Sequence, residues 1–423
     1  MNTLFPLITE YNEEFKVYYT YRKVFFNWNI NSEAYRLHKQ YTDFPDSSYY
    51  WVYPKGEEPK ERHVLFGTFY VQHEIWKHQF PETCQDKKFL IVPLISTGMG
   101  SIIHLLPYAL TLALETNRIL IVKPILVSYW GDKEFCDPDN NSILCYLAPL
   151  TNCTVSDEDI QRSFNNNTEF ISPTHAHILT YSEVFHHPSV QYVYLEKYHK
   201  VRKSPRFITK FLKGSSMREF DVFQYWRFQA AAFLTRLNEK TVSWIHEYEK
   251  EKCKDCDNEY DISLNIRHAD KGSEMELISA NVYKEAINIF TSLGMKDNYS
   301  IYVNADDQES VDIIHKLPHR VAFFNHTRYN FSVDQNRQLK HVALMSFANL
   351  YNQIRADHTI GTIESNWSRL IYELKMTVGM KSDGYILEVG EQYCISFSNC
   401  LQRNAQMTYY YFTFKQNKEK KAR

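Results

Sequence analysis

The stretch DISLNIRHADKGSEME, residues 261–276, joins a short apolar run to a dense group of charged side chains. The run DISLNIR (261–267) has the length and the Ile and Leu content of a buried strand. Five charged residues and one histidine follow between Arg267 and Glu276. A strand that ends in such a group predicts a polar site at its carboxyl end.

After this stretch, helices of about 10 to 18 residues alternate with further strands. This alternation predicts a Rossmann-like, doubly wound parallel sheet, in which ligands bind beyond the carboxyl ends of the strands. The polar clusters RHADK, NADD, NHTR and TIESN each follow a strand, which favours a binding cleft there. The expected strands are 261–267, 299–307, 320–326 and 358–365, and the expected helices are 281–294, 308–317, 340–357 and 366–379.

The first half of the chain also reads as α/β. A lead-in helix (64–80) precedes a strand (87–95), a glycine turn, a helix (102–117) with Pro107 after its first turn, and a second strand (118–126). This order is typical of a βαβ unit and a parallel sheet. We further expect a strand at 190–196, a long amphipathic helical region at 220–252 and a short β hairpin within 384–414.

A chain of 423 residues is long for one core, so we expect two α/β domains with a cleft between them. The expected segments are a helical lead-in rich in aromatics (1–80), a first α/β domain (81–256), a Rossmann-like domain (257–390) and a C-terminal extension (391–423). No Src-homology-3-like segment is expected in the extension.

The overall composition is that of an ordinary globular protein. The formal net charge of -2 gives no reason to expect a nucleic acid as partner. Three glutamates within the first 15 residues argue against a signal peptide. The uncharged stretch 89–114 is interrupted by prolines and glycines, so we expect no membrane span. Eight cysteines and seven N-x-S/T sequons point towards a secretory compartment without deciding it.

Several charged residues in these clusters allow two interpretations. Arg267 could bind a diphosphate through its planar guanidinium, or pair with Asp270 at the surface. Lys271 lies three residues before Glu274, so it could hold that carboxylate ionised as a general base, although an exposed helical pair has the same spacing.

The remaining candidates are helix caps or ligand contacts. Asp306 and Asp307 could bind a metal, but we prefer a helix cap at Asp307. Gly98 and Gly100 before a helix suit an anion or a simple turn. Ser365, four residues before Arg369, could contact phosphate or cap a helix. The CxxC at residues 253–256 is a weak metal motif.

Five motifs, taken in order, resemble the GDP-fucose-dependent α-1,6-fucosyltransferases of the core N-glycan type and, more distantly, the rhizobial nodulation fucosyltransferase. The resemblance covers some two-thirds of the chain, from about residue 75 to about residue 373. The motifs are HEIWKHQFPETCQDKKFLIV (73–92), STGMGSIIHLLPYALTLALETNRILIV (96–122), IRHADKGSE (266–274), NADD (304–307) and ADHTIGTIESNWSRLIYE (356–373).

This resemblance implies a GT-B-like fold and an inverting transfer of fucose from GDP-fucose to a glycan, with neither a metal nor a cofactor. It implies Glu274 as general base, Lys271 and Asp270 beside it, Arg267 on the diphosphate, and Cys84 paired within the first domain. By the same resemblance the protein acts in the Golgi or the secretory lumen, although the missing leader also allows the cytoplasm. The implied donor-binding residues are Arg267, Asn265, His268, Tyr129, Gly98, Gly100, Ser101, Tyr283, Asp306, Asp307, Asn349 and Ser365.

The chain also departs from the family pattern. Asn265 and Asn349 stand where the family reads guanine with a histidine and an aspartate, His268 replaces a second arginine, and Glu364 replaces a serine. These departures support a first alternative, a catalytically weak relative that binds a glycan or a nucleotide sugar. A second alternative is a peptide O-fucosyltransferase-like enzyme.

Overall fold

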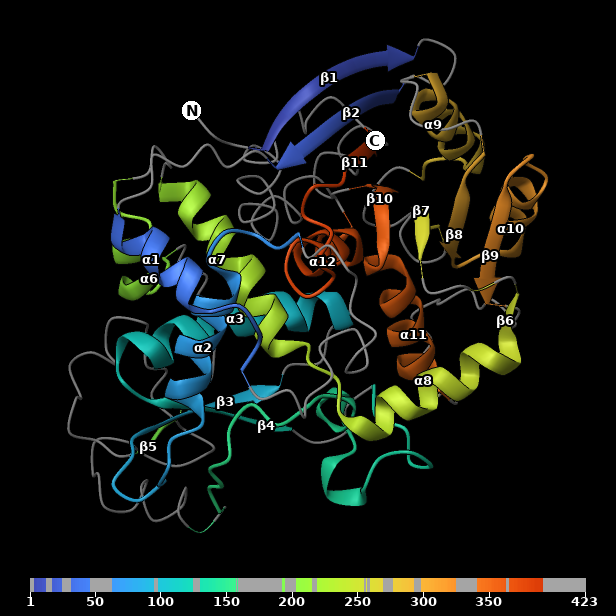
Figure 1. Ribbon diagram of the computed structural model, residues 1–423. Helices are drawn as coiled ribbons and strands as arrows, with labels where there is room; N and C mark the ends of the chain where they lie inside the picture. Colours follow the sequence, from blue (N-terminus) through green and yellow to red (C-terminus); the bar gives the residue numbers. More distant parts are fainter. Residues whose placement is uncertain are drawn as a thin grey trace, which may run out of the picture.

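A computed structural model gives the architecture of the chain (Figure 1). The structure describes residues 4–12, 17–24, 32–45, 63–94, 98–124, 130–156, 158, 192–194, 203–214, 219–254, 256, 259–268, 277–292, 298–324, 341–362 and 365–390. Within these residues it is a mixed α/β protein with two sheets.

The larger sheet has the order β1-β2-β11-β10-β7-β8-β9-β6. Its five central strands are parallel, and from β9 to β11 their order is that of a Rossmann sheet. The predicted doubly wound parallel sheet is therefore confirmed. The strands are β1 (Leu4–Asn12), β2 (Val17–Val24), β6 (Cys253–Lys254), β7 (Tyr260–Ile266), β8 (Ser300–Ala305), β9 (Arg320–Phe324), β10 (Ala356–Gly361) and β11 (Ile386–Gly390).

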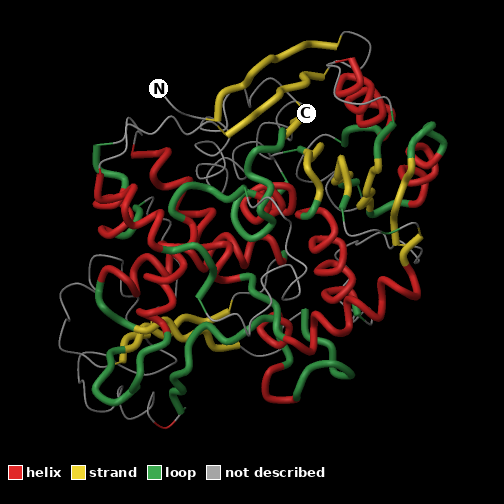
Figure 2. Tube along the Cα trace, viewed as in Figure 1, coloured by secondary structure: helices red, strands yellow, loops and turns green. Residues whose placement is uncertain are grey.

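Helices cover both faces of this sheet (Figures 1 and 2). Alternate residues of β8 pack on opposite sides: Ile301 and Val303 join one apolar cluster with α9 and α10, while Tyr302 joins another with α11 and α12. The neighbouring strand β7 is covered on both faces as well, so it is buried along nearly its whole length, its polar residues Ser263 and Asn265 included. These helices are α9 (Ala280–Ser292), α10 (Gln308–His315), α11 (Val342–Ile354) and α12 (Asn366–Lys375).

The smaller sheet has the order β4-β3-β5, with parallel pairing throughout. It confirms the predicted βαβ unit and the predicted strand within 190–196. One face of this sheet forms a third apolar cluster with Val155 and Cys153, through Phe89, Ile91, Ile119 and Ile121. The elements are α2 (Thr68–Gln79), β3 (Phe89–Leu94), α3 (Met99–Glu115), β4 (Ile119–Pro124) and β5 (Tyr192–Tyr194).

Helix α12 follows a strand of the large sheet but packs with helices of the first half of the chain. Its residues Leu370 and Ile371 share one apolar cluster with Ile102 and Leu106 of α3 and Trp226 of α7 (Glu219–Leu234). The two sheets are thus joined through a common core. Residue 256 as a domain boundary stays a prediction.

Four local expectations differ from the structure. The region 220–252 is two helices, because Asn238 caps α8 (Glu239–Lys252) after a break, and α7 is buried almost all round instead of amphipathic. Helix α3 begins at Met99, so Pro107 lies well inside it. Strand β11 lies between β10 and β2, so residues 386–390 are not an arm of the expected hairpin, and the rest of that segment lies outside the described residues. Residues 4–12 and 17–24, expected to belong to a helical lead-in, form the antiparallel strands β1 and β2 at the sheet edge. The short helices α1 (Ser32–Gln40) and α6 (Arg206–Phe211) complete the set described.

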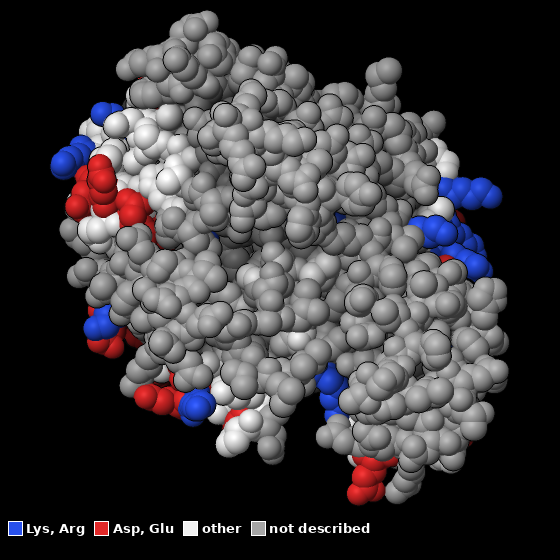
Figure 3. All heavy atoms as spheres, turned by 180° about the vertical axis from the view of Figure 1, so that it is seen from behind, with Lys and Arg blue, Asp and Glu red and all other residues white. Residues whose placement is uncertain are grey.

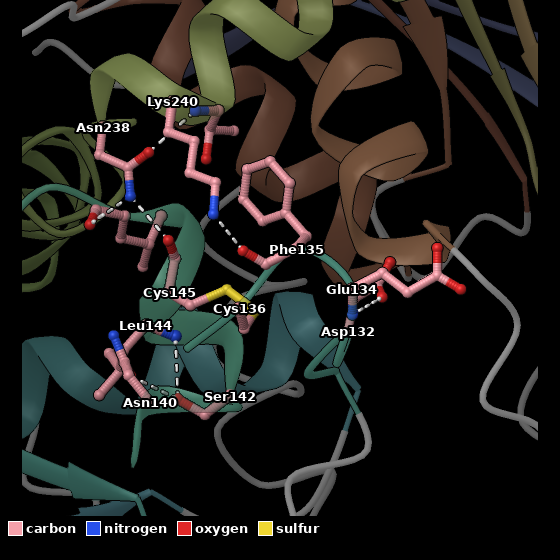
Figure 4. Close-up of a disulfide and its surroundings, with 12 residues drawn as sticks. Asp132, Glu134, Phe135, Cys136, Asn140, Ser142, Leu144, Cys145, Asn238 and Lys240 are labelled. Atoms are coloured by element: carbon pink, nitrogen blue, oxygen red, sulfur yellow. Dashed lines mark hydrogen bonds between the residues drawn. A yellow bond between two sulfur atoms is a disulfide. The ribbon is translucent and has the colours of Figure 1, made fainter. Parts of the chain in front are cut away.

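Three disulfides lie within the described residues: Cys84–Cys153, Cys136–Cys145 and Cys253–Cys256. The first confirms that Cys84 pairs within the first domain. The second closes a loop with two 3-10 turns (Pro138–Asn140 and Ile143–Tyr146), and the side chains of Asn238 and Lys240 bind its backbone carbonyls at Cys145 and Phe135 (Figure 4). Disulfides are compatible with a secreted or lumenal protein.

The described residues on one face of the molecule include charged side chains of both signs. On the face turned away from the view of Figure 1, acidic and basic side chains of the described residues both lie near the rim (Figure 3). Such mixing agrees with the small net charge. None of the described helices is long and apolar enough to cross a membrane.

Candidate functional site

The candidate site lies at the point where the strand order of the large sheet reverses, between β7 and β10. Strands β7 and β10 are neighbours, but β7 leads to α9 on one face and β10 leads to α12 on the other. Ligands of doubly wound sheets bind at such a switch point, beyond the carboxyl ends of the strands. Asn265 pairs with Gly361 at this end, so Arg267 and Ser365 follow the two strands directly.

Arg267 and His268 are held by the two aspartates that end β8. The Arg267 guanidinium donates to Asp306 over 2.5 Å, and the His268 backbone N–H donates to the same carboxylate over 2.8 Å. His268 Nδ1 lies 2.8 Å from Asp307 Oδ2. This geometry fixes the direction of the Arg267 side chain, of which 20% stays exposed.

Asp307 is the N-cap of α10, accepting from the Ser310 backbone N–H over 2.7 Å. The preferred interpretation, a helix cap, is confirmed. Tyr283 on α9 is buried nearby, and burial, together with the Asp306 carboxylate, raises its pKa. His268 Nε2 lies 2.7 Å from the Ile278 carbonyl, just before α9. The motif residues Arg267, His268, Asp306, Asp307 and Tyr283 are therefore gathered in one place.

The N-termini of α3 and α12 meet on the other side of the switch point. The Asn366 side chain donates to Ser101 Oγ over 2.7 Å, and a Cβ at Gly100 would lie 3.1 Å from Asn366 Cβ. The backbone of Gly100 is not left-handed, so its conformation does not require a glycine. The close approach of α3 and α12 at this point does. Ser365 is buried and caps α12 by accepting from Ser368 N, and Gly98 caps α3.

A buried ionic cluster lies one to two turns behind these N-termini. Glu373 of α12 accepts from Arg227 over 2.7 Å and lies 3.0 Å from His104 Nε2. Burial alone raises the pKa of Glu373, but Arg227, His104 and Arg369 outweigh it, so its pKa is lowered. Burial lowers the pKa of His104, while Glu373 opposes this change. Glu373 is thus an ionised carboxylate in the protein interior.

The two asparagines expected to read a base lie inside the protein. Asn265 is fully buried, donating to Ser368 Oγ over 2.7 Å and accepting from Asn304 over 3.0 Å. Asn349 accepts from the Tyr302 hydroxyl over 2.9 Å and donates to the Met345 carbonyl. Both amides therefore have protein partners, and a role in base recognition stays a prediction.

Four expected site residues lie outside the described residues: Tyr129, Asp270, Lys271 and Glu274. Their roles also stay predictions. Among the residues that the structure does describe, no group of three or more His, Cys, Asp or Glu side chains is placed to hold a metal ion.

Sequence reasoning missed His104, Arg227, Asn366 and Glu373 as a connected set. The contacts that connect them join residues 146 to 269 positions apart, and they form only when α3, α7 and α12 pack together. One local signal existed: His104 follows Gly98 and Gly100 in a G-x-G-x-x-x-H pattern, which places it one turn into the helix and on the same side.

No protein-family model matches the chain, and no curated protein matches it significantly. Among solved structures, the chain is similar to a variant of FUT1 from Arabidopsis thaliana in complex with GDP (TM-score 0.45, 12% identity, 80% of this chain and 84% of that chain). It is also similar to the NodZ alpha-1,6-fucosyltransferase soaked with GDP-fucose (0.36, 13%, 68% and 93%) and to POFUT1 in complex with GDP-fucose (0.34, 10%, 70% and 96%). None of these matches assigns a role to a residue of this chain.

Proposed function

We propose that this chain is a glycosyltransferase that transfers a sugar, fucose by its sequence motifs, from a nucleoside diphosphate donor to a glycan acceptor. The observation that carries the proposal is the meeting of two helix N-termini, those of α3 and α12, at the switch point of a Rossmann-ordered sheet, where Arg267 follows β7 two residues after Asn265, which donates to Ser368 of α12. Helix N-termini and a guanidinium are groups that bind a diphosphate.

The held geometry of Arg267 supports catalysis as well as binding. When the bond to the sugar breaks, negative charge develops on the leaving diphosphate, and donors fixed in advance stabilise it most. Asp306 orients the Arg267 side chain before any ligand arrives. Glu274, next to Lys271, would accept the proton of the acceptor hydroxyl, and a single displacement would invert the sugar configuration. With these groups the reaction would need no metal ion.

The identity of the base is the least supported element of the proposal. An asparagine can accept from guanine, but the amides of Asn265 and Asn349 already have partners within the protein. Reading guanine through them would require the exchange of these hydrogen bonds. The donor test therefore compares bases as well as sugars.

The test is calorimetric titration of the full chain with GDP, GDP-fucose and UDP, first with EDTA and then with Mg²⁺. We expect GDP binding without metal, weakened at least tenfold, or about 1.4 kcal/mol, by Arg267→Ala. The matched control is Arg320→Ala, an arginine at the opposite end of β9, which should bind GDP like the natural chain. Fucose transfer to a glycan is then measured with the same proteins.

The possible results separate the alternatives. GDP binding without any transfer to glycan or peptide acceptors would favour the catalytically weak receptor. Transfer to a peptide hydroxyl alone would favour the peptide enzyme. No binding of any nucleotide would rule out the proposed function.

A further inference from the structure

A continuous row of polar contacts runs along the line where α3 and α12 touch. It starts at the N-termini, where Asn366 donates to Ser101 over 2.7 Å. One turn further, His104 Nδ1 lies 3.2 Å from Asn366 Oδ1 and its Nε2 lies 3.0 Å from Glu373. The row ends on Arg227 of α7, 2.7 Å from the second Glu373 oxygen. We call Ser101, His104, Asn366 and Glu373, with Arg227, the interhelix row.

Each member of the row is tied to the next, and the members alternate between the two halves of the chain. Ser101, His104 and Arg227 belong to helices of the first half, whereas Asn366 and Glu373 belong to α12. A slide of α12 along α3 by one turn would break every contact at once. The row therefore fixes the distance between the two helix N-termini and their relative position along the helix axes.

From this arrangement we propose that Glu373 is a positioning residue, which acts through His104 and Asn366 to align the N-termini of α3 and α12 for a diphosphate. The inference rests on the proposed function, because the aligned N-termini are its diphosphate site. Glu373 itself does not touch the donor; its carboxylate lies nearly two turns into the helix.

Stability alone is a poor explanation for this row. Replacing a buried ion pair by apolar side chains of similar size is often neutral or stabilising, because desolvation offsets the attraction. Ile102 and Leu106 of α3 and Leu370 of α12 belong to one apolar cluster, so the two helices also share an apolar core. Buried polar groups have their best-attested role in fixing register, as in coiled coils.

Two variants separate register from charge. Glu373→Gln removes the charge but keeps the row, because the amide oxygen can accept from Arg227 and the amide N–H can donate to neutral His104. Glu373→Met removes both connections. Either variant leaves the Arg227 cation without its carboxylate, so we expect both to lose thermal stability, the methionine more because it also removes the hydrogen bond to Arg227. We expect GDP affinity within threefold of the natural chain for the glutamine and at least tenfold weaker for the methionine.

The matched control is Ile371→Ala, which removes a fully buried side chain from the same helix without touching the row. It should lower stability and leave GDP affinity unchanged. If affinity simply follows the loss of stability across all three variants, Glu373 is an ordinary structural residue and the proposal is wrong. Tight binding by Glu373→Met would overturn it as directly.

Hydrogen exchange of the same proteins provides a readout that needs no ligand. We expect Glu373→Met to speed exchange in peptides covering residues 99–104 and 366–369 at least tenfold, and to leave α7 protected. Unchanged exchange there would contradict the positioning role even if the natural chain binds no nucleotide. A natural chain without nucleotide binding, but with this exchange pattern, would reject the proposed function and retain the alignment.

Discussion

Helix α12 buries two charged side chains near its carboxyl end, Glu373 and Lys375, with opposite results. Glu373 meets Arg227 and His104, and these partners lower its pKa in spite of burial. Two residues further along, the Lys375 ammonium contacts the Asp357 carbonyl and Thr359 Oγ1, and burial lowers its pKa to about 7. Asp357 offers its carboxylate to Lys381 instead, over 2.6 Å.

The difference shows that the partner, and not burial itself, decides whether a group stays charged. A carboxylate that accepts from an arginine stays ionised in the interior, whereas an ammonium held by neutral oxygens loses its proton easily. Glu373 contacts helices α3 and α7, whereas Lys375 contacts strand β10. Two substitutions test this contrast, and two more test the packing and the polar contacts around the candidate site.

The largest effect is expected from Arg227→Met. It leaves the Glu373 carboxylate buried with His104 and no arginine hydrogen bond, a loss that costs about 3–5 kcal/mol for a buried pair. Urea unfolding of the variant measures the cost. Arg206→Met, at an ion pair whose arginine is largely exposed, is the control and should unfold like the natural chain. A cost below about 1 kcal/mol would show that the pair is not a strong one.

The second effect concerns Lys375→Met and depends on pH. The folded-state pKa of Lys375 is about 7, below the ordinary value of 10.5, so the unfolded chain binds more protons between these two values. The stability of the natural chain should therefore rise with pH across that window, and the full cost of burying the ammonium should be present below pH 7. The methionine variant lacks this dependence.

We expect Lys375→Met to be more stable than the natural chain at pH 6 and less stable at pH 10, where the lost hydrogen bonds dominate. The difference between the two proteins should change by on the order of 3 kcal/mol over this range. Urea unfolding at several pH values measures it, with exposed Lys316→Met as the control. A difference that does not vary with pH would mean that Lys375 stays charged in the folded protein.

The fold was largely predictable because its signals are local. The strands around Ile262 and Ile301 are marked by their own Ile, Leu, Val and Tyr residues, and caps such as Asp307 stand at the helix starts that they mark. The same locality explains the errors. The break before α8 depends on a single capping residue, Asn238, inside a stretch of helical composition.

The site was predictable in part. Arg267, His268 and the two aspartates were found because each follows a strand, and strand ends share one edge of the sheet. The burial of Asn265 and the contact of Glu373 with Arg227 could not be predicted, because they depend on how α12 docks against other helices. For the same reason, Gly100 was interpreted as an anion-binding or turn residue and its contact with α12 was not expected.

The two glycines before and within α3 give the third prediction. A Cβ at Gly100 would lie 3.1 and 3.2 Å from Asn366 atoms, one of them backbone, whereas a Cβ at Gly98 has its nearest neighbour at 3.9 Å. Gly100→Ala should therefore push α12 away and lower stability by about 1–2 kcal/mol. Gly98→Ala is the matched control and should change stability little. Equal effects of the two substitutions would mean that the helices do not touch as closely as described.

The smallest effect is expected from Asn349→Ala, and it separates two roles of one residue. If the amide serves the interior, its removal leaves the Tyr302 hydroxyl without its acceptor and lowers the unfolding free energy by about 1 kcal/mol, with GDP affinity unchanged. If the amide reads guanine, affinity for GDP falls tenfold or more while affinity for UDP stays the same. We expect the first result, because the carbonyl and the amino group of Asn349 already bind protein atoms.

Tyr302→Phe provides the control: it removes the same hydrogen bond from the other side, so it should reproduce the loss of stability and leave the discrimination between GDP and UDP untouched. A drop in GDP affinity for Asn349→Ala alone would show that Asn349 contacts the donor. Its hydrogen bonds to Tyr302 and Met345 would then have to exchange when GDP binds.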